Sequence, residues 1–227
     1  MKRALIVVAK RPEPGRTKTR LCPPLSEEQA SALYECFLKD TLAVAHALVG
    51  AERFLAFTPS DQMDYFRPLA PDFGLLPQVG HNLGERLDNA LTCCLAGGFD
   101  RAVIASSDSP TLTAGHLAAA FEALDEADVV LGPCADGGYY LIGLRRPNPS
   151  LLRGVRMSTH EVLRDTVALA EAGGLSVALT PLLYDIDCLD DLRRLWVDLA
   201  ESPPGIAEHT RAFLRTLKLK AAGPGFW

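Results

Sequence analysis

Three aspartates stand at positions where their carboxylates can reach a ligand. Asp108 follows the apolar run that starts at Val103, within the turn Ser-Asp-Ser-Pro, and Asp185 and Asp187 lie two residues apart later in the chain. Side chains two apart in an extended segment point to the same side, so Asp185 and Asp187 can face one cation. Carboxylates held close together repel one another unless a cation lies between them, and their oxygens suit Mg²⁺ or Mn²⁺. The three residues predict a divalent-metal site; for Asp108 the alternative is a cap of the following helix.

A cationic loop follows the first apolar run of the chain. Residues 10–21 carry five cationic side chains and one acid, with Pro and Gly residues that oppose a helix. Lysines and arginines such as Lys10, Lys18 and Arg20 supply charge and donors for phosphate oxygens, and Gly15 lets backbone N–H groups approach an oxyanion. The P-loop pattern GxxxxGK[ST] is absent. The loop predicts a phosphate clamp, and the alternative is a solvated basic loop.

A glycine-containing turn at residues 78–87 is a further candidate for ligand contact. Glycines such as Gly84 allow a flat or anionic ligand to come close, and Asn82 has the donors and acceptors to read a base edge. An ordinary tight turn explains the same residues.

The sequence Asp136-Gly137-Gly138 between two apolar runs predicts a β-hairpin. Gly137 and Gly138 leave bare backbone beside any ligand there, and Tyr139 with its neighbouring tyrosine can form a pocket wall. A hairpin without a site is the alternative. Further along, Ser158 or Thr159 with Glu161 suits the N-terminus of a helix, which is also a ready anion site.

These candidates need elements that hold them together. Fully apolar runs at 4–9 and 103–105 predict strands buried on both faces. Further strands are expected near residues 53–57, 73–79 (interrupted by Pro77), 128–132 and 176–180. Helical spacing or capping signals predict helices over 26–50, 60–69, 83–97 and 113–127, and after 158 and 188. The pattern predicts an α/β fold, in which ligands bind beyond the carboxyl ends of the strands.

Composition bounds the class of protein. With 227 residues, of which 48% are hydrophobic, the chain can form one domain over 1–227. A net charge of -5 with mixed signs gives no footprint for nucleic acid or an anionic membrane. The six cysteines show no metal or redox spacing and are expected to be reduced, and no run is long enough for a signal peptide or a membrane span. We expect a cytoplasmic protein.

Four motifs in a shared order carry a family resemblance. The loop from Lys10 to Leu21, Ser106-Ser107-Asp108-Ser109-Pro110, residues 135–140 and the segment from Asp185 to Leu192 resemble a bacterial glycosyltransferase-like family (DUF2064-type) of the nucleotide-diphospho-sugar transferase (GT-A) superfamily. This family is similar to phospholactate and phosphoenolpyruvate guanylyltransferases. The resemblance implies a three-layer α/β/α sandwich with a mixed, mainly parallel sheet.

The resemblance also implies site roles. Lys10, Lys18 and Arg20 would hold the nucleotide phosphates, Asn82 and Gly84 would lie near the base, and the three aspartates would bind Mg²⁺. The motifs are less specific for the reaction, and the cationic loop favours nucleotidyl transfer from a nucleoside triphosphate (NTP) to a small phosphorylated acceptor. This reaction needs no general base, because a phosphate is already ionised.

Two other functions remain open from the residues. Glycosyl transfer from a nucleotide-diphospho sugar requires a base for the attacking hydroxyl, for which Asp136 is the motif candidate. A catalytically silent nucleotide-binding protein is the third hypothesis. We expect Lys18, Asp108 and Asp136 to act in catalysis and Gly137, Gly138, Tyr139 and Ser158 to contact substrate. The base, the acceptor and the oligomeric state are left open.

Overall fold

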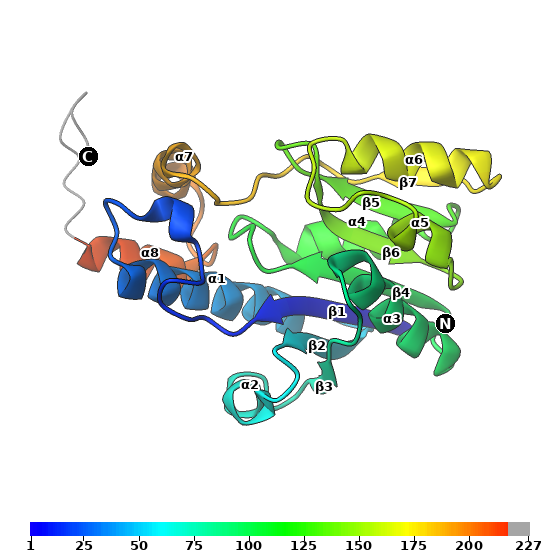
Figure 1. Ribbon diagram of the computed structural model, residues 1–227, viewed down its shortest axis with the longest axis horizontal. Helices are drawn as coiled ribbons and strands as arrows, with labels where there is room; N and C mark the ends of the chain where they lie inside the picture. Colours follow the sequence, from blue (N-terminus) through cyan, green and yellow to red (C-terminus); the bar gives the residue numbers. More distant parts are fainter. Residues whose placement is uncertain (218–227) are drawn as a thin grey trace.

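The sheet is the element on which every predicted site residue depends. A computed structural model describes residues 1–217, and in this part of the chain seven strands form one sheet in the order β3-β2-β1-β4-β6-β5-β7 (Figure 1). β6 runs antiparallel to its neighbours β4 and β5, and the other pairs are parallel. The strands span β1 Arg3–Lys10, β2 Glu52–Thr58, β3 Gly74–Pro77, β4 Arg101–Ser106, β5 Val129–Pro133, β6 Tyr139–Leu144 and β7 Val177–Leu179.

Helices cover both faces of the sheet. They span α1 Glu27–Ala47, α2 Met63–Leu69, α3 Leu83–Ala96, α4 Ala114–Ala123, α5 Pro149–Arg153, α6 Val162–Ala172, α7 Leu189–Glu201 and α8 Glu208–Thr216, with a 3-10 turn η1 at Thr19–Leu21. Along β1, Leu5 and Val7 pack with α1, α2 and α4, whereas Ala4 and Ile6 pack with α3, α5 and α6. Both faces of β1 are therefore buried, as its continuous apolar sequence predicts. The predicted three-layer α/β/α sandwich with a mixed, mainly parallel sheet is confirmed.

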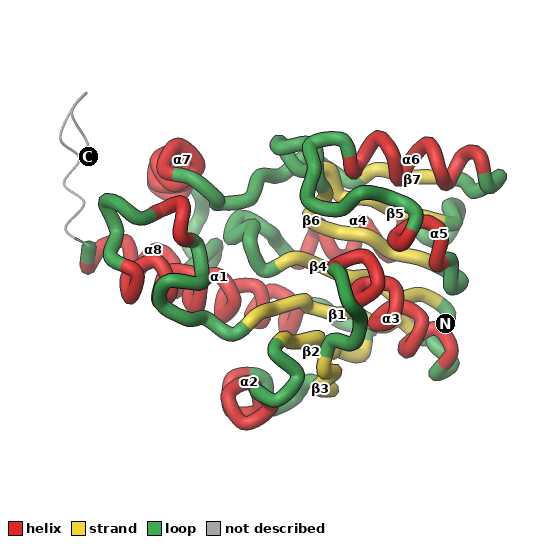
Figure 2. The backbone as a smooth tube through the Cα atoms, viewed as in Figure 1, coloured by secondary structure: helices red, strands yellow, loops and turns green. Residues whose placement is uncertain are grey.

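A third apolar cluster lies at the carboxyl end of the sheet. α7, α8 and the segment before α7 pack on the N-terminal half of α1 through Tyr184, Ile186 and their neighbours. Buried Asp40 of α1 fixes this packing, because its carboxylate accepts hydrogen bonds from His209 N and Thr210 N of α8, both at 2.9 Å. Figure 2 shows the loops that follow β1 and β4 leaving the sheet on the side where α7 and α8 lie. The C-terminal helices thus hold residues 185–187 against these two loops.

Most local predictions are confirmed, and three need correction. The capping box of Ser26 and the hairpin between β5 and β6 are present. The predicted strand over 73–79 ends at Pro77, because proline lacks the N–H that would continue the ladder. The predicted helix over 113–127 ends at Ala123. Neither Ser158 nor Thr159 caps α6, which begins after Glu161 without a side-chain cap.

All six cysteines are free thiols, as expected. Among residues 1–217 no helix combines the length and apolarity that crossing a membrane requires.

Candidate active site

Two adjoining cavities open at the carboxyl end of the central strands. The first, the cationic cavity, has a volume of about 450 Å³ and is lined by charged residues of the 10–21 loop, by Arg86 and by two carboxylates. The second, the hairpin cavity, has a volume of about 410 Å³ and is lined mainly by α3, the β5–β6 hairpin and residues 157–162. Arg20, Asp108 and Asp187 line both, as do Val8 and Leu83. These shared residues mark the boundary at which two bound molecules can meet.

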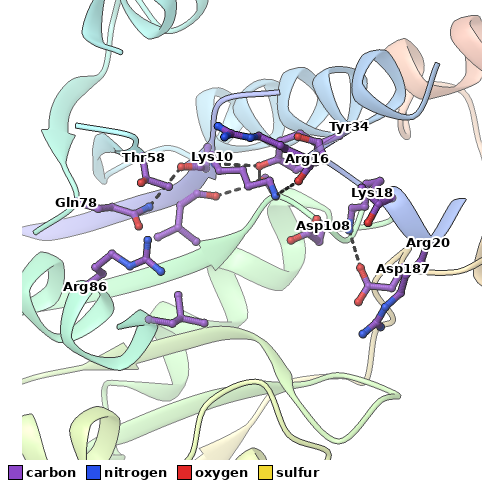
Figure 3. Close-up of a pocket in the computed structure, with 16 residues that line it drawn as sticks. Lys10, Arg16, Lys18, Arg20, Tyr34, Thr58, Gln78, Arg86, Asp108 and Asp187 are labelled. Carbon is purple, nitrogen blue, oxygen red and sulfur yellow. Dashed lines mark hydrogen bonds and ion pairs between the residues drawn. The ribbon is translucent and has the colours of Figure 1, made fainter. Parts of the chain in front are cut away.

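Lys18 lies at this boundary, between two carboxylates. Its Nζ is 2.5 Å from Asp108 Oδ1 and 2.8 Å from Asp187 Oδ1, and its side chain is 7% exposed (Figure 3). The backbone of Lys18 is left-handed, with φ 51°, a conformation that costs free energy for a residue with a Cβ. Burial by itself lowers the pKa of Lys18, but the attraction of Asp108 and Asp187 outweighs it, and the pKa is raised. Lys18 is therefore positively charged at neutral pH.

Asp108 and Asp187 are held in place by their backbones. Asp108 follows β4, and its carbonyl oxygen accepts a hydrogen bond from Ile186 N at 3.1 Å. The N–H of Asp187 donates to Asp191 Oδ2 at 3.0 Å in the first turn of α7. The cap of α4 is Thr113, so the helix-cap alternative for Asp108 is wrong. In each carboxylate, Oδ1 is the oxygen that contacts Lys18.

Asp185 lies beside this pair without joining it. Its carboxylate accepts a hydrogen bond from the hydroxyl of Ser109 and lines the hairpin cavity. Burial raises the pKa of Asp185 to about 6, and the negative charge of Asp108 adds to the effect.

The carboxylates at this boundary are candidate ligands of a metal ion. In the described part of the chain no three carboxylate, histidine or cysteine side chains are grouped so that they could hold a metal ion. Asp108 and Asp187, however, lie close enough to share Lys18. A carboxylate pair is what Mg²⁺ uses in sites completed by substrate phosphates and water. The pair fits such an ion, and Asp185 as a third ligand stays a prediction.

Tyr34 of α1 ties the two loops together and was not predicted. Its hydroxyl lies 2.9 Å from Ser107 Oγ and accepts a hydrogen bond from Lys10 N at 3.2 Å, while Ser107 donates to Val8 O. Burial raises the pKa of Tyr34 to about 12, and the charge of Asp108 contributes. The tyrosine fixes the end of β1 relative to the turn that carries Asp108. An inward-facing tyrosine in a helical apolar stripe gives no sequence signal for this role.

The cationic loop encloses its cavity. Lys10, Arg16, Lys18 and Arg20 line it, and Lys10 Nζ donates to Arg16 O at 2.6 Å. Gly15 has φ 72°, which suits glycine, and lies against the carboxylate of Glu27 rather than among the lining residues.

The turn before α3 places two predicted residues away from both cavities. Asn82 caps α3, because its Oδ1 accepts from Glu85 N at 2.9 Å. A Cβ on Gly84 would lie 2.2 Å from Leu152 O, so this glycine serves the packing of α3 on α5. The residues of this region that do line the cationic cavity are Gln78, Leu83 and Arg86, and none of them was predicted as a site residue. The rule that ligands bind beyond parallel strands could have identified Gln78, which directly follows β3.

The β5–β6 hairpin forms one wall of the hairpin cavity. Asp136, the predicted catalytic base, lines it together with Gly138, Tyr139 and Ser158, whose contact with substrate stays a prediction. Asp136 Oδ1 accepts from Gly138 N at 2.9 Å. Gly137 does not line the cavity; a Cβ there would lie 2.0 Å from His160 O, so it allows the hairpin to pack on residues 158–160.

Comparison with known proteins finds relatives among transferases that use nucleotide substrates and a further protein of the same fold. The chain is 30% identical over 207 residues to the 2-phospho-L-lactate guanylyltransferase of Methanothermobacter thermautotrophicus, covering 88% of this chain and 85% of the relative. A solved protein of Desulfovibrio desulfuricans G20, assigned to the nucleotide-diphospho-sugar transferases, has a TM-score of 0.89 and 31% identity over 95% of each chain. Rv0371c of Mycobacterium tuberculosis, solved with manganese, has a TM-score of 0.55 and 17% identity over 86% of this chain and 98% of that chain, and shares the fold.

The family model "Uncharacterized protein conserved in bacteria" (DUF2064) matches residues 41–159, a segment that runs from α1 to the turn before α6 and includes Asp108 and the hairpin. The chain therefore belongs to the DUF2064 family, within the nucleotide-diphospho-sugar transferase superfamily of transferases.

Proposed function

We propose that the protein transfers a nucleotidyl group from an NTP to a small phosphorylated acceptor and releases pyrophosphate, with Mg²⁺ as cofactor. The observation that carries this proposal is the boundary between the cavities. Lys18, Asp108 and Asp187 lie there, with a cationic cavity on one side and the hairpin cavity on the other. The similarity to a guanylyltransferase over most of both chains supports the same reaction class.

The charges of the two cavities indicate which substrate each one binds. Lys10, Arg16 and Arg20 attract the triphosphate into the cationic cavity, because guanidinium and ammonium groups bind phosphate oxygens strongly. The hairpin cavity receives the acceptor. A phosphate oxygen of the acceptor attacks the α-phosphorus, a new phosphorus–oxygen bond forms, and the bond to the bridging oxygen breaks as pyrophosphate leaves. Lys18, which is positively charged at neutral pH, stabilises the added negative charge.

Asp108 and Asp187 would hold the Mg²⁺ ion, which neutralises charge on the phosphate oxygens when bound. Rv0371c, a protein of the same fold, has been solved as a complex with manganese, and this supports the choice of a divalent cation as the cofactor. Both aspartates contact Lys18 in this structure, so holding a metal would require Lys18 to give up at least one of these contacts, and a bound phosphate would be its alternative partner.

Glycosyl transfer is the second candidate, and one observation favours it. Asp136 lines the hairpin cavity, where a base for a sugar hydroxyl would be needed. Against it, one carboxylate oxygen of Asp136 is already occupied by Gly138 N. We rank this reaction second.

The test is pyrophosphate release with Mg²⁺, each of the four common NTPs and a panel of phosphorylated acceptors that begins with 2-phospho-L-lactate. Asp187→Asn is expected to lower kcat by about 100-fold or more, since it removes charge from a metal ligand. The matched control is Asp190→Asn, at an exposed aspartate in the first turn of α7 that pairs with Arg193; it should change kcat by less than about twofold. Consumption of a nucleotide sugar in place of any NTP would overturn the proposal, and so would full activity of Asp187→Asn.

A further inference from the structure

The cationic cavity has a second end, away from Lys18 and its aspartates. Figure 3 shows Thr58, Gln78 and Arg86 together at this end, with Lys18, Asp108 and Asp187 at the other. Leu83, in the same first turns of α3 that carry Arg86, lines both cavities, and its side chain is 37% exposed. If the triphosphate lies over the cationic loop, the base of the nucleotide lies here. We call this group the base end.

Gln78 presents a fixed hydrogen-bond acceptor. Its Nε2 donates to Ala56 O at 2.8 Å and to Ala9 O at 3.4 Å. Because both partners are carbonyl oxygens, only the nitrogen of the amide can face them, and the orientation of the amide is determined. Its Oε1 has no partner within residues 1–217. The backbone N–H of Gln78 donates to Phe57 O at 2.8 Å, so the residue is held at both ends.

Arg86 presents donors at the same end. Its Nε donates to Asn82 O at 3.3 Å, which fixes the start of the guanidinium group. The two terminal nitrogens have no partner among the residues described. Arg86 therefore offers a fork of donors to a ligand, and Leu83 offers an apolar surface for the face of a ring.

We infer that the base end reads guanine, with Arg86 donating to O6 and N7 and Gln78 Oε1 accepting from N1–H or the N2 amino group. This inference rests on the proposed nucleotide site. Around its ring, guanine presents two adjacent acceptors, N7 and O6, and then two donors, N1–H and the N2 amino group, and an arginine fork is the common partner of the two acceptors. Adenine presents its amino donor where guanine has O6, and a bare acceptor where guanine has N1–H. Adenine therefore places a donor against the donors of Arg86 and an acceptor against Gln78 Oε1. Uracil has one acceptor, O4, for Arg86 and one donor, N3–H, for Gln78 Oε1.

The test is a binding measurement that does not depend on transfer. Calorimetric dissociation constants are measured for GDP, ADP, UDP and CDP with Mg²⁺ and without acceptor. The wild type should bind GDP more tightly than ADP by about 10- to 100-fold, the discrimination expected of one good bidentate contact. UDP should fall between them.

Arg86→Gln is the decisive variant, because glutamine pairs with the N6 and N7 positions of adenine. The ratio of ADP to GDP dissociation constants should fall by about 10-fold or more. Arg86→Met, which keeps the apolar stem, should lose preference for GDP without gaining affinity for ADP. The matched control is Arg16→Gln at the phosphate end, which should weaken both nucleotides equally and leave the ratio unchanged.

Equal binding of GDP and ADP by the wild type, or an unchanged ratio in Arg86→Gln, would overturn the base assignment and leave the transfer proposal standing. Failure of every nucleotide to bind would overturn both. Selective GDP binding without pyrophosphate release from GTP would support the base assignment and count against nucleotidyl transfer.

Discussion

Replacing Lys18 with methionine removes the cation between Asp108 and Asp187 and keeps the length of the side chain. The left-handed backbone remains equally unfavourable in the variant, so its cost cancels in the comparison. Two oxygens that contact one nitrogen lie no more than about 5 Å apart, and unit charges at that distance repel by about 3 kcal/mol at an effective dielectric constant of about 20. The aspartate side chains are 37% and 49% exposed, so solvent screening reduces this repulsion.

We therefore expect Lys18→Met to lower the free energy of unfolding by about 1–2 kcal/mol in EDTA, measured by urea denaturation followed by circular dichroism. Mg²⁺ should restore part of this loss, because an ion that binds only the folded protein stabilises it. The matched control is Lys39→Met, which breaks an exposed pair with Glu35 and should cost less than about 1 kcal/mol, with no response to Mg²⁺. Wild-type stability of Lys18→Met in EDTA would refute the electrostatic reasoning. No response of that variant to Mg²⁺ would refute the metal pair.

Two predictions concern stability away from the site. Burial lowers the pKa of His116, whose Nδ1 accepts from Thr113 N at 3.1 Å in the cap of α4, so the unfolded chain binds a proton more readily than the folded chain. The free energy of unfolding should decline as the pH falls through 6.5, the usual pKa of histidine, toward the lower pKa of the folded protein. His116→Gln, which keeps a hydrogen-bond acceptor in the cap, should lose this pH dependence. Identical shifts of the urea midpoint between pH 7.5 and 5.5 in both proteins would count against the reasoning. Asp40→Ala leaves buried donors of α8 unpaired and should lower the free energy of unfolding by about 2–4 kcal/mol, with faster amide exchange in α8 than in α3. Unchanged amide exchange in α8 would contradict the role of Asp40 in holding α8 against α1.

The strands and helices of the sandwich were predictable from the sequence, whereas the partners of most site side chains were not. Continuous apolar runs predicted β1 and β4 because strands covered on both faces need no polar residues. The rule for carboxyl ends of strands then predicted that Asp108 would lie at a site. That Asp185 and Asp187 would take different partners was not predictable, since the choice depends on Ser109 and Lys18, which come from other segments.

The role of Lys18 illustrates the limit most clearly. Its charge made it a phosphate ligand in the prediction, but its position between two carboxylates depends on a left-handed backbone and on a partner 169 residues away. Asn82 and Gly84 illustrate the opposite case. Their types suited ligand contact, yet the structure uses them for capping and helix packing. Polar and glycine residues serve both purposes, and only the packing around them decides which.

The most direct test of nucleotidyl transfer follows the two ends of the triphosphate. GTP labelled with phosphorus-32 at either the α- or the γ-position is incubated with enzyme, Mg²⁺ and the acceptor that gives the highest pyrophosphate release. The α-label should appear in the acceptor product and the γ-label in pyrophosphate, and Asp187→Asn should form neither. An acceptor that carries the γ-label, or GTP that yields only GDP and inorganic phosphate, would contradict the account.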